Sequence, residues 1–299
     1  MSIDEEIRRH MTTQPVPRIS IVIAVLNAAE ELRTTLRSVE AQSVGVLERI
    51  EVVIADGGST VGTLEVARSS SLRTNIVSEP DRGIYDAMNK GAARATGSWL
   101  HFLNAGDAFN RDDALQIVLD DLEQADHHAA SWYIAGARFV GGPVDGLRIP
   151  NLPHAWRRHA LGLQPHCHQA TWFRADVFAA LGGYSLDFGF VGDFDLILRW
   201  GVLSRPYTNE VVLIDYLYGG LSEQRALEIP GLTRRVREER LQLDPMSLHL
   251  DDARIRVSRA ADRTWHVLSR TSRFARRLMT GGAAVRPIAI SDTRSSVGA

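Results

Sequence analysis

Apolar runs and segments with helical spacing alternate along the first half of the chain. Four short apolar runs, rich in β-branched residues, predict strands that are buried on both faces. These strands are expected at residues 19–26, 50–55, 74–78 and 98–103. The segments that follow them predict helices at 29–42, 63–70, 83–95 and 112–124. Because strand and helix alternate in the manner of βαβ units, we expect an α/β domain with a Rossmann-like sheet flanked by helices.

After residue 131 the pattern is less regular. Residues 151–166 are polar and aromatic and predict a loop. The remaining segments predict strands within 131–150 and at 171–174 and 210–218, and helices at 175–181 and 193–201. From about residue 228 onward the pattern is helical and rich in arginine.

The chain divides by composition into four expected parts. They are a flexible lead at 1–17, a folded domain at 18–225, a basic helical extension at 226–280 and a disordered tail at 281–299. The lead ends at two prolines, and the tail lacks the apolar periodicity of a packed segment.

The composition indicates a globular protein that is stable without disulfide bonds. Apolar residues make up 44% of the 299 residues and charged residues 23%. The single cysteine, Cys167, excludes an intrachain disulfide and fits a reducing compartment. The N-terminus has no apolar signal-peptide core, and no apolar run is long enough to span a membrane. We therefore expect a cytoplasmic location, with the inner face of the cell membrane as the alternative.

The formal net charge of −2 conceals an uneven distribution. Residues 251–299 contain ten arginines and four aspartates, so the rest of the chain is acidic. Between 254 and 279 apolar residues interleave with arginine, which is typical either of peripheral contact with an anionic membrane or of a helix packed on the domain. The acidic remainder argues against a nucleic-acid partner. Lys90 is the only lysine, which singles out its position.

Polar clusters follow three of the predicted strands, at 56–60, 79–82 and 104–107. Right-handed crossovers place the carboxyl ends of parallel strands at one edge of a sheet, where ligands of such sheets bind. Asp56 is suited to accept from a nucleotide base or a ribose hydroxyl, and the glycines after it permit close approach. Ser59 or Thr60 is expected to cap the next helix. A plain strand–turn–helix connection is the alternative.

The segment 79–91 is unusually polar for the start of a helix. Asp81 and Gly83 are expected at its N-terminus, which attracts anions such as a diphosphate. Asp86, Asn89 and Lys90 have the spacing of one helix face, although an exposed Asp–Lys pair would have the same spacing. Gly97 is expected to end this helix as its C-cap.

Two further clusters contain candidate catalytic and metal-binding groups. Asn104 and Asp107 supply the hard oxygens that Mn²⁺ or Mg²⁺ prefers, or they form a turn. Asp193 at the start of a predicted helix is either a general base or an N-cap, and Asp195 follows it. The run from His166 to Gln169 has no second Cys/His cluster, so zinc is not expected. His168 is then either a substrate contact or a structural histidine.

Taken together, these motifs resemble the family 2 glycosyltransferases of the GT-A fold, in particular those that build bacterial exopolysaccharides and glycolipids, such as the colanic acid transferases. The resemblance covers about residues 18–222. It rests on the order of the segments 20–28, 56–60, 79–91, 95–97, 102–107, 167–170 and 192–195.

The resemblance implies an inverting enzyme with a mixed sheet. The enzyme would move a sugar from a UDP- or GDP-linked donor to a hydroxyl of a carbohydrate or lipid-linked acceptor. Residues 18–110 would form the nucleotide-sugar half and 111–225 the acceptor half. The implied donor-binding residues are Ala24, Asn27, Asp56, Asp81, Gly83, Lys90 and Asn104. Asp107 would bind the divalent cation and Asp193 would be the general base. His168, Gln169 and Asp195 would contact the acceptor or the diphosphate.

The chain departs from the family pattern at three places. Ala24-Val25-Leu26 stands at the end of the first strand, where the family often has Pro-Thr-Tyr or a similar run. The Asp-x-Asp motif appears as Asn104-Ala105-Gly106, which leaves Asp107 as its only nearby carboxylate. Gly192 precedes Asp193 where the family has Glu-Asp. One alternative is therefore a degenerate relative that binds a nucleotide sugar or a partner without turnover. The other is a nucleotidyltransferase, although residues 27–30 lack the basic, glycine-rich phosphate loop expected of one.

Overall fold

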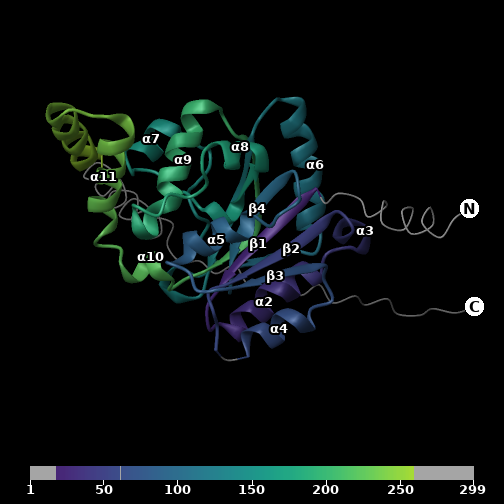
Figure 1. The fold of residues 1–299 in the computed structure, drawn as a ribbon. Helices are drawn as coiled ribbons and strands as arrows, with labels where there is room; N and C mark the ends of the chain where they lie inside the picture. Colours follow the sequence, from purple (N-terminus) through teal and green to yellow (C-terminus); the bar gives the residue numbers. More distant parts are fainter. Residues whose placement is uncertain (1–17, 61, 259–299) are drawn as a thin grey trace, which may run out of the picture. The chain divides into compact units, whose positions relative to one another are not determined.

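A computed structural model describes residues 18–60 and 62–258 of the chain (Figure 1). The chain divides into two compact units, 1–251 and 252–299, and the sheet and its helices belong to the first. The expected lead at 1–17 and tail at 281–299 lie outside the described residues, as does the extension beyond 258.

Eight strands form a single sheet with the order β3-β2-β1-β4-β7-β6-β8-β5. The strands are β1 (Ile19–Val25), β2 (Ile50–Asp56), β3 (Thr74–Ser78), β4 (Trp99–Asn104), β5 (Ala108–Phe109), β6 (Trp132–Val140), β7 (Thr171–Arg174) and β8 (Tyr207–Leu217). The expected strands of the first half are all present, and the sheet is mixed. β3, β2, β1 and β4 run parallel, whereas β7 is antiparallel to both β4 and β6.

The parallel strands bring their carboxyl ends together at one edge, as the sequence predicts. In the register of the sheet, Ala24 pairs with Ala55 on one side and with Asn104 on the other. Asp56, at the end of β2, pairs with Ser78 at the end of β3. The polar clusters that follow β2, β3 and β4 therefore leave the sheet at the same edge, with the end of β1 between those of β2 and β4.

Ten helices surround the sheet within the described residues. They are α2 (Ala29–Glu40), α3 (Val44–Leu47), α4 (Thr63–Ser69), α5 (Ile84–Ala92), α6 (Ala114–His127), α7 (Trp156–Ala160), α8 (Ala175–Ala180), α9 (Gly192–Leu203), α10 (Leu221–Gln224) and α11 (Ile229–Leu241). Three 3₁₀ turns add η1 (Gly142–Val144), η2 (His168–Ala170) and η3 (Gly189–Val191). Residues 245–258 are also helical. No described helix is long and apolar enough to cross a membrane.

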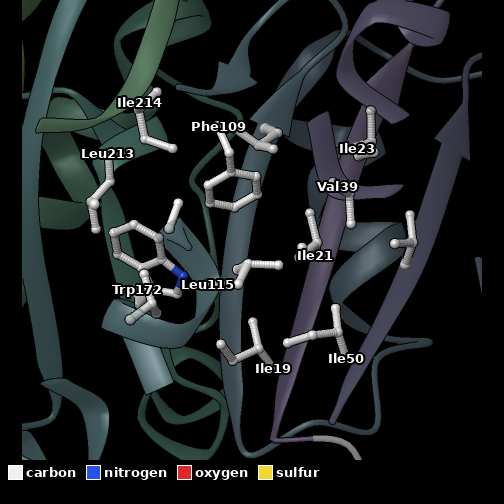
Figure 2. Close-up of a cluster of buried hydrophobic side chains, with 14 of the residues drawn as sticks. Ile19, Ile21, Ile23, Val39, Ile50, Phe109, Leu115, Trp172, Leu213 and Ile214 are labelled. Carbon is white, nitrogen blue, oxygen red and sulfur yellow. The ribbon is translucent and has the colours of Figure 1, made fainter. Parts of the chain in front are cut away.

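β1, β2 and β4 bury both of their faces. β3 is only partly buried, so the expectation of a strand buried on both faces is wrong at 74–78. Ile19, Ile21 and Ile23 of β1 pack with residues of α2 and α6 on one face (Figure 2). Val22 and Ala24 point to the opposite face, where they pack with residues of α5 and α9. Figure 1 shows α2 and α4 on one side of the sheet and α5, α8 and α9 on the other. Each fully buried Val, Leu or Ile contributes about 1.5–3 kcal/mol, so this three-layer packing fixes the positions of the strand ends.

Three local expectations are wrong. Ser59 and Thr60 do not cap α4, because its N-cap is Gly62, with φ of 61°. Gly97 is not the C-cap of α5, which ends at Ala92. A Cβ at Gly97 would lie 2.6 Å from Ser20 Oγ, so close packing against β1 requires this glycine. The predicted loop at 151–166 contains α7, which buries His159 and Ala160.

Candidate functional site

Asp56 shapes the loop that follows β2. Its carboxylate accepts hydrogen bonds from Ser78 Oγ at 2.6 Å and from the backbone N–H of Ser59 at 3.1 Å. Burial raises the pKa of Asp56, but these hydrogen bonds outweigh it and hold the pKa below its ordinary value. The side chain is therefore ionised and almost enclosed, at the position where the sequence predicts contact with the nucleotide.

Asn27 connects the end of β1 to the same loop. It has a left-handed backbone conformation with φ of 50°, which asparagine tolerates better than most residues. Its backbone N–H donates to Ser59 Oγ at 2.7 Å, and its side-chain Oδ1 accepts from the N–H of Thr60 at 2.9 Å. The hydroxyls expected to cap α4 are thus used to hold the β1 and β2 loops together.

Asp81 and Gly83 lie beside this loop, at the start of α5. Asp81 Oδ1 accepts from the N–H of Gly83 at 2.8 Å. Gly83 is the N-cap residue of α5, with φ of 121°, a region that glycine occupies without strain. A Cβ on Gly57 would overlap the Asp81 carboxylate, so the loops after β2 and β3 are in direct contact.

Lys90 secures the turn that precedes α5. Its Nζ lies 3.3 Å from Asp86 Oδ2 and 3.2 Å from Glu79 Oε1, and it donates to the Pro80 carbonyl at 2.7 Å. The Arg82 side chain and the other hydrogen bonds of Asp86 lower the pKa of that carboxyl to about 2. Lys90 and Asp86 therefore share a helix face as predicted, and both bind the 79–82 turn.

Asn89 does not join that ionic cluster. Its Nδ2 donates to the Tyr184 carbonyl at 2.8 Å, and its Oδ1 accepts from the Tyr184 N–H at 2.9 Å. This pair of hydrogen bonds connects α5 to the loop before α9.

Asp107 is enclosed by the elements around it. Only 3% of the residue is exposed. Its Oδ2 accepts from Gln169 Nε2 at 3.0 Å and its Oδ1 accepts from the N–H of Leu217 at 2.9 Å. Burial raises the pKa of Asp107 to about 6, although these donors oppose the shift.

These contacts do not fit the expected role of Asp107 as a cation ligand. Both of its oxygens are already engaged, and a Cβ on Gly106 would lie 2.7 Å from Leu217 Cδ2, so a carboxylate cannot replace that glycine. Asn104 Oδ1 is buried without a hydrogen-bond partner among the described residues, but it is a single neutral oxygen. No group of three His, Cys, Asp or Glu residues within 18–60 and 62–258 is placed to hold a metal.

Asp193 lies in the first turn of α9. The N-cap of this helix is Val191, so the N-cap interpretation of Asp193 is wrong. Its Oδ1 accepts from the N–H of Phe194 at 2.8 Å, its Oδ2 lies 3.5 Å from Nδ1 of His168, and 25% of the side chain is exposed. Burial raises the pKa of Asp193, but His168 and the other hydrogen-bond donors outweigh it and lower the pKa. Asp193 is thus an ionised carboxylate whose side chain is partly exposed.

Asp195 is not available to a ligand. It is fully buried, and its Oδ2 accepts from Arg199 Nη2 at 2.7 Å while its Oδ1 accepts from Arg240 Nε at 2.6 Å. The expected contact with acceptor or diphosphate is therefore replaced by a structural role, in which Asp195 joins α9 to α11. Gln169 is likewise buried and engaged with Asp107.

Two tyrosines near Asp193 were not predicted from the sequence. Tyr85 of α5 donates to the Phe190 carbonyl at 3.3 Å, and burial together with Asp193 raises its pKa. Its ring stacks on Tyr184 with centroids 4.8 Å apart. Tyr85 lies within the 79–91 motif, which is the only signal that separates it from an ordinary core aromatic.

The structure thus forms two clusters joined by α5. Asn27, Asp56, Asp81 and Lys90 surround the loops after β1, β2 and β3. Around η2, Asp107 contacts Gln169 and Asp193 lies beside His168. Tyr85 and Asn89 of α5 connect the clusters, so one helix links the loop-lined edge of the sheet to the region of an ionised carboxylate.

Comparison with known proteins gives a consistent result. Residues 20–181 match the family model described as Glycosyl transferase family 2. The chain is 35% identical over 212 residues to an uncharacterized glycosyltransferase of Mycobacterium tuberculosis, which covers 70% of this chain and 78% of that protein. It is 33% identical over 219 residues to a PGL/p-HBAD biosynthesis glycosyltransferase of Mycobacterium bovis, covering 69% and 79% of the two chains.

Two solved structures share the fold at low sequence identity. One is S. aureus TarS in complex with UDP-GlcNAc, with a TM-score of 0.60 and 16% identity, covering 79% of this chain and 69% of that chain. The other is a mannosyltransferase from Pyrobaculum calidifontis in complex with GDP-Man and Mn²⁺, with a TM-score of 0.60 and 17% identity, covering 93% and 82%.

Proposed function

The chain belongs to glycosyl transferase family 2 and has a GT-A-like α/β fold, and from this premise we propose that it is an inverting transferase acting on a UDP- or GDP-linked sugar. The observation that carries the proposal is the placement of Asp193. This ionised carboxylate, with 25% of its side chain exposed, lies in the first turn of α9, and α5 connects this region to the loops proposed to bind the donor. A base at this position is suited to deprotonate an acceptor hydroxyl as it attacks the donor sugar.

The donor proposal is supported by the loops at the carboxyl ends of β1, β2 and β3. Ala24, Asn27 and Asp56 lie at the first two ends, and Asp81, Gly83 and Lys90 form the third. TarS was solved with a UDP-linked sugar and the mannosyltransferase with a GDP-linked sugar, so the shared fold accommodates either nucleotide. We propose that these six residues and Asn104 surround the donor.

In the proposed reaction the acceptor oxygen attacks the anomeric carbon from the face opposite the diphosphate. One displacement forms the new glycosidic bond and releases the nucleoside diphosphate, so the configuration inverts and no covalent intermediate is needed. Asp193 supplies the basic group, and the domain supplies the alignment of the two substrates. The enclosed Asp107 does not fit a cation ligand, so no step is assigned to a metal on this chain.

The acceptor is proposed to be a carbohydrate or a lipid-linked molecule, because one relative is named for PGL/p-HBAD biosynthesis. A lipid-linked acceptor would place the reaction at the inner face of the cell membrane. The basic segment at 254–279 is the part proposed for membrane contact, and beyond residue 258 it lies outside the described residues. Flotation with anionic liposomes tests this, and unchanged binding after truncation at residue 250 would refute it.

The central experiment measures transfer and donor binding separately. Purified protein is screened against UDP- and GDP-linked sugars by thermal shift, and transfer is then followed by nucleotide release and by the anomeric configuration of the product. Asp193→Asn should abolish turnover and preserve donor binding, whereas Asp120→Asn, on the exposed side of α6, should behave like wild type. Retention of configuration, or full activity of Asp193→Asn, would contradict the proposal.

A further inference from the structure

Two buried polar atoms near Asp193 have no hydrogen-bond partner among the described residues. They are Nε2 of His168 and the hydroxyl of Tyr184. Only 7% of His168 and 2% of Tyr184 is exposed, and their rings pack edge to face with centroids 6.5 Å apart. Buried polar atoms of folded proteins are normally paired. The unpaired Nε2 of His168 therefore lacks a partner that a bound ligand could supply.

The contact with Asp193 determines what His168 can accept. Nδ1 of His168 lies 3.5 Å from Asp193 Oδ2. Asp193 is ionised, since its pKa is lowered despite its burial, and an ionised carboxylate only accepts hydrogen bonds. Nδ1 of the neutral ring must then carry the hydrogen, which leaves a lone pair on Nε2. The unpartnered Nε2 is consequently an acceptor that matches a hydroxyl group and not a phosphate.

We propose that Nε2 of His168 receives the proton of the attacking acceptor hydroxyl, and that Asp193 acts through it. This inference rests on the proposed function and changes one step of it: His168 takes the proton from the acceptor, and Asp193 positions His168. As the acceptor oxygen bonds to the anomeric carbon, the bond from that carbon to the diphosphate breaks and its electron pair leaves with the nucleotide. The acceptor proton moves to Nε2. Asp193 holds the ring in the required tautomer and stabilises the imidazolium, as the carboxylate does in a Ser-His-Asp triad.

The charged groups around His168 favour this proton transfer. Asp193 faces the ring from α9, and Asp107 from the turn after β4 interacts with it over a longer range. Both are negative when ionised, so they stabilise a positive ring. Tyr85 of α5 and Tyr184 of the loop before α9 pack edge to face against the His168 ring. Two further histidines interact with it, His101 of β4 and the adjacent His166, and burial lowers the pKa of each so that both stay neutral.

The test removes the imidazole by substituting His168 and then adds free imidazole to the solution to restore activity. His168→Ala should lower kcat by about 10²- to 10⁴-fold, the range typical of a lost general base. Added imidazole should restore activity by at least about tenfold, and a series of substituted imidazoles should give rates that rise with the basicity of the neutral form. Donor binding by calorimetry shows that the variant is folded. A kcat within about threefold of wild type, or no rescue in a variant that binds donor, would overturn the proposal.

His168→Asn gives a second variant if the alanine form does not fold. Its amide keeps a donor toward Asp193 but has no group at the position of Nε2, so it should be as slow as His168→Ala. His128→Ala is the control, because His128 stacks on Tyr207 at the end of α6 and should leave kcat unchanged. Wild-type activity in His168→Asn would overturn the assignment.

The outcome for Asp193 distinguishes this inference from the proposed function. Asp193→Asn should be inactive and should not respond to imidazole. If Asp193→Asn is inactive while His168→Ala is fully active, the inference fails and Asp193 contacts the acceptor itself. If wild-type protein binds no nucleotide sugar and transfers none, the proposed function fails instead.

Discussion

Gln169 donates a hydrogen bond from Nε2 to Oδ2 of Asp107 at 3.0 Å, and so joins η2 to the turn that follows β4. The other oxygen of Asp107 accepts from the backbone of Leu217 at the end of β8. One carboxylate therefore connects three segments that are far apart in the sequence. This explains why Asp107 is enclosed although it lies beside the edge of the sheet where the donor is expected.

Asp107→Asn should lower the stability of the domain without changing its cation dependence. Loss of a charge-assisted bond in a buried network costs about 1–3 kcal/mol, which urea denaturation can measure. Because the wild-type carboxyl is not placed to bind a cation, the Mn²⁺ and Mg²⁺ concentrations for half-maximal activity should be the same in both proteins. A large shift of either concentration in a variant of normal stability would return Asp107 to the role of metal ligand.

Buried histidines should make the domain sensitive to acid. Burial lowers the pKa of His159 to about 4, against about 6.5 in an unfolded chain. The unfolded state thus binds more protons between these values, so stability is lost as the pH falls through this window. The effect of this one residue is about 3 kcal/mol at pH 4. His159→Gln keeps a donor toward the Phe194 carbonyl but does not titrate.

The measurement is the difference in unfolding free energy between wild type and His159→Gln across pH 7 to 4. As the pH falls, the unfolding free energy of the variant should decrease less than that of the wild type. Parallel curves would show that His159 is protonated equally in the folded and unfolded states.

Much of the fold could be predicted because its main signals are local. A buried parallel strand is a continuous apolar run, and β1, β2 and β4 were each placed within one residue of their starting points. The insertion of β7 between β4 and β6 could not be predicted, because strand pairing depends on partners distant in the sequence. The short helix α7 was missed since five residues carry too little periodicity.

The site shows the same division between local and distant information. Residues at the ends of strands, such as Asp56 and Asn104, were correctly placed at one edge because parallel topology requires it. The enclosure of Asp107 depends on Gln169 and Leu217, which are 62 and 110 residues away. The burial of Asp195 likewise depends on Arg240, 45 residues away. No spacing rule connects such partners before the chain folds.

Arg199 should be essential for stability because it neutralises the buried Asp195. Its Nε and Nη2 lie 2.9 and 2.7 Å from the same carboxylate oxygen. Arg199→Met removes this partner and leaves a buried charge underpaired, which should cost about 3–5 kcal/mol. The double variant Arg199→Met/Asp195→Leu also removes the buried carboxylate, so it should recover part of the lost stability. A double variant less stable than the single one would show that the ion pair contributes more than its burial costs.

Gly97→Ala should destabilise the sheet where Gly45→Ala should not. A Cβ on Gly97 would lie 2.7 Å from the backbone nitrogen of Ser20 and 2.9 Å from the backbone carbon of Ile19, and neither atom can move without displacing β1. We expect a loss of about 1–3 kcal/mol, the usual cost of overpacking. Gly45, in α3, has no atom within 4 Å of its added Cβ, and a helical alanine there should stabilise by about 0.5–1 kcal/mol. Opposite shifts of the urea midpoint in the two variants would confirm that Gly97 is retained for close packing, whereas equal shifts would attribute both effects to glycine's backbone freedom.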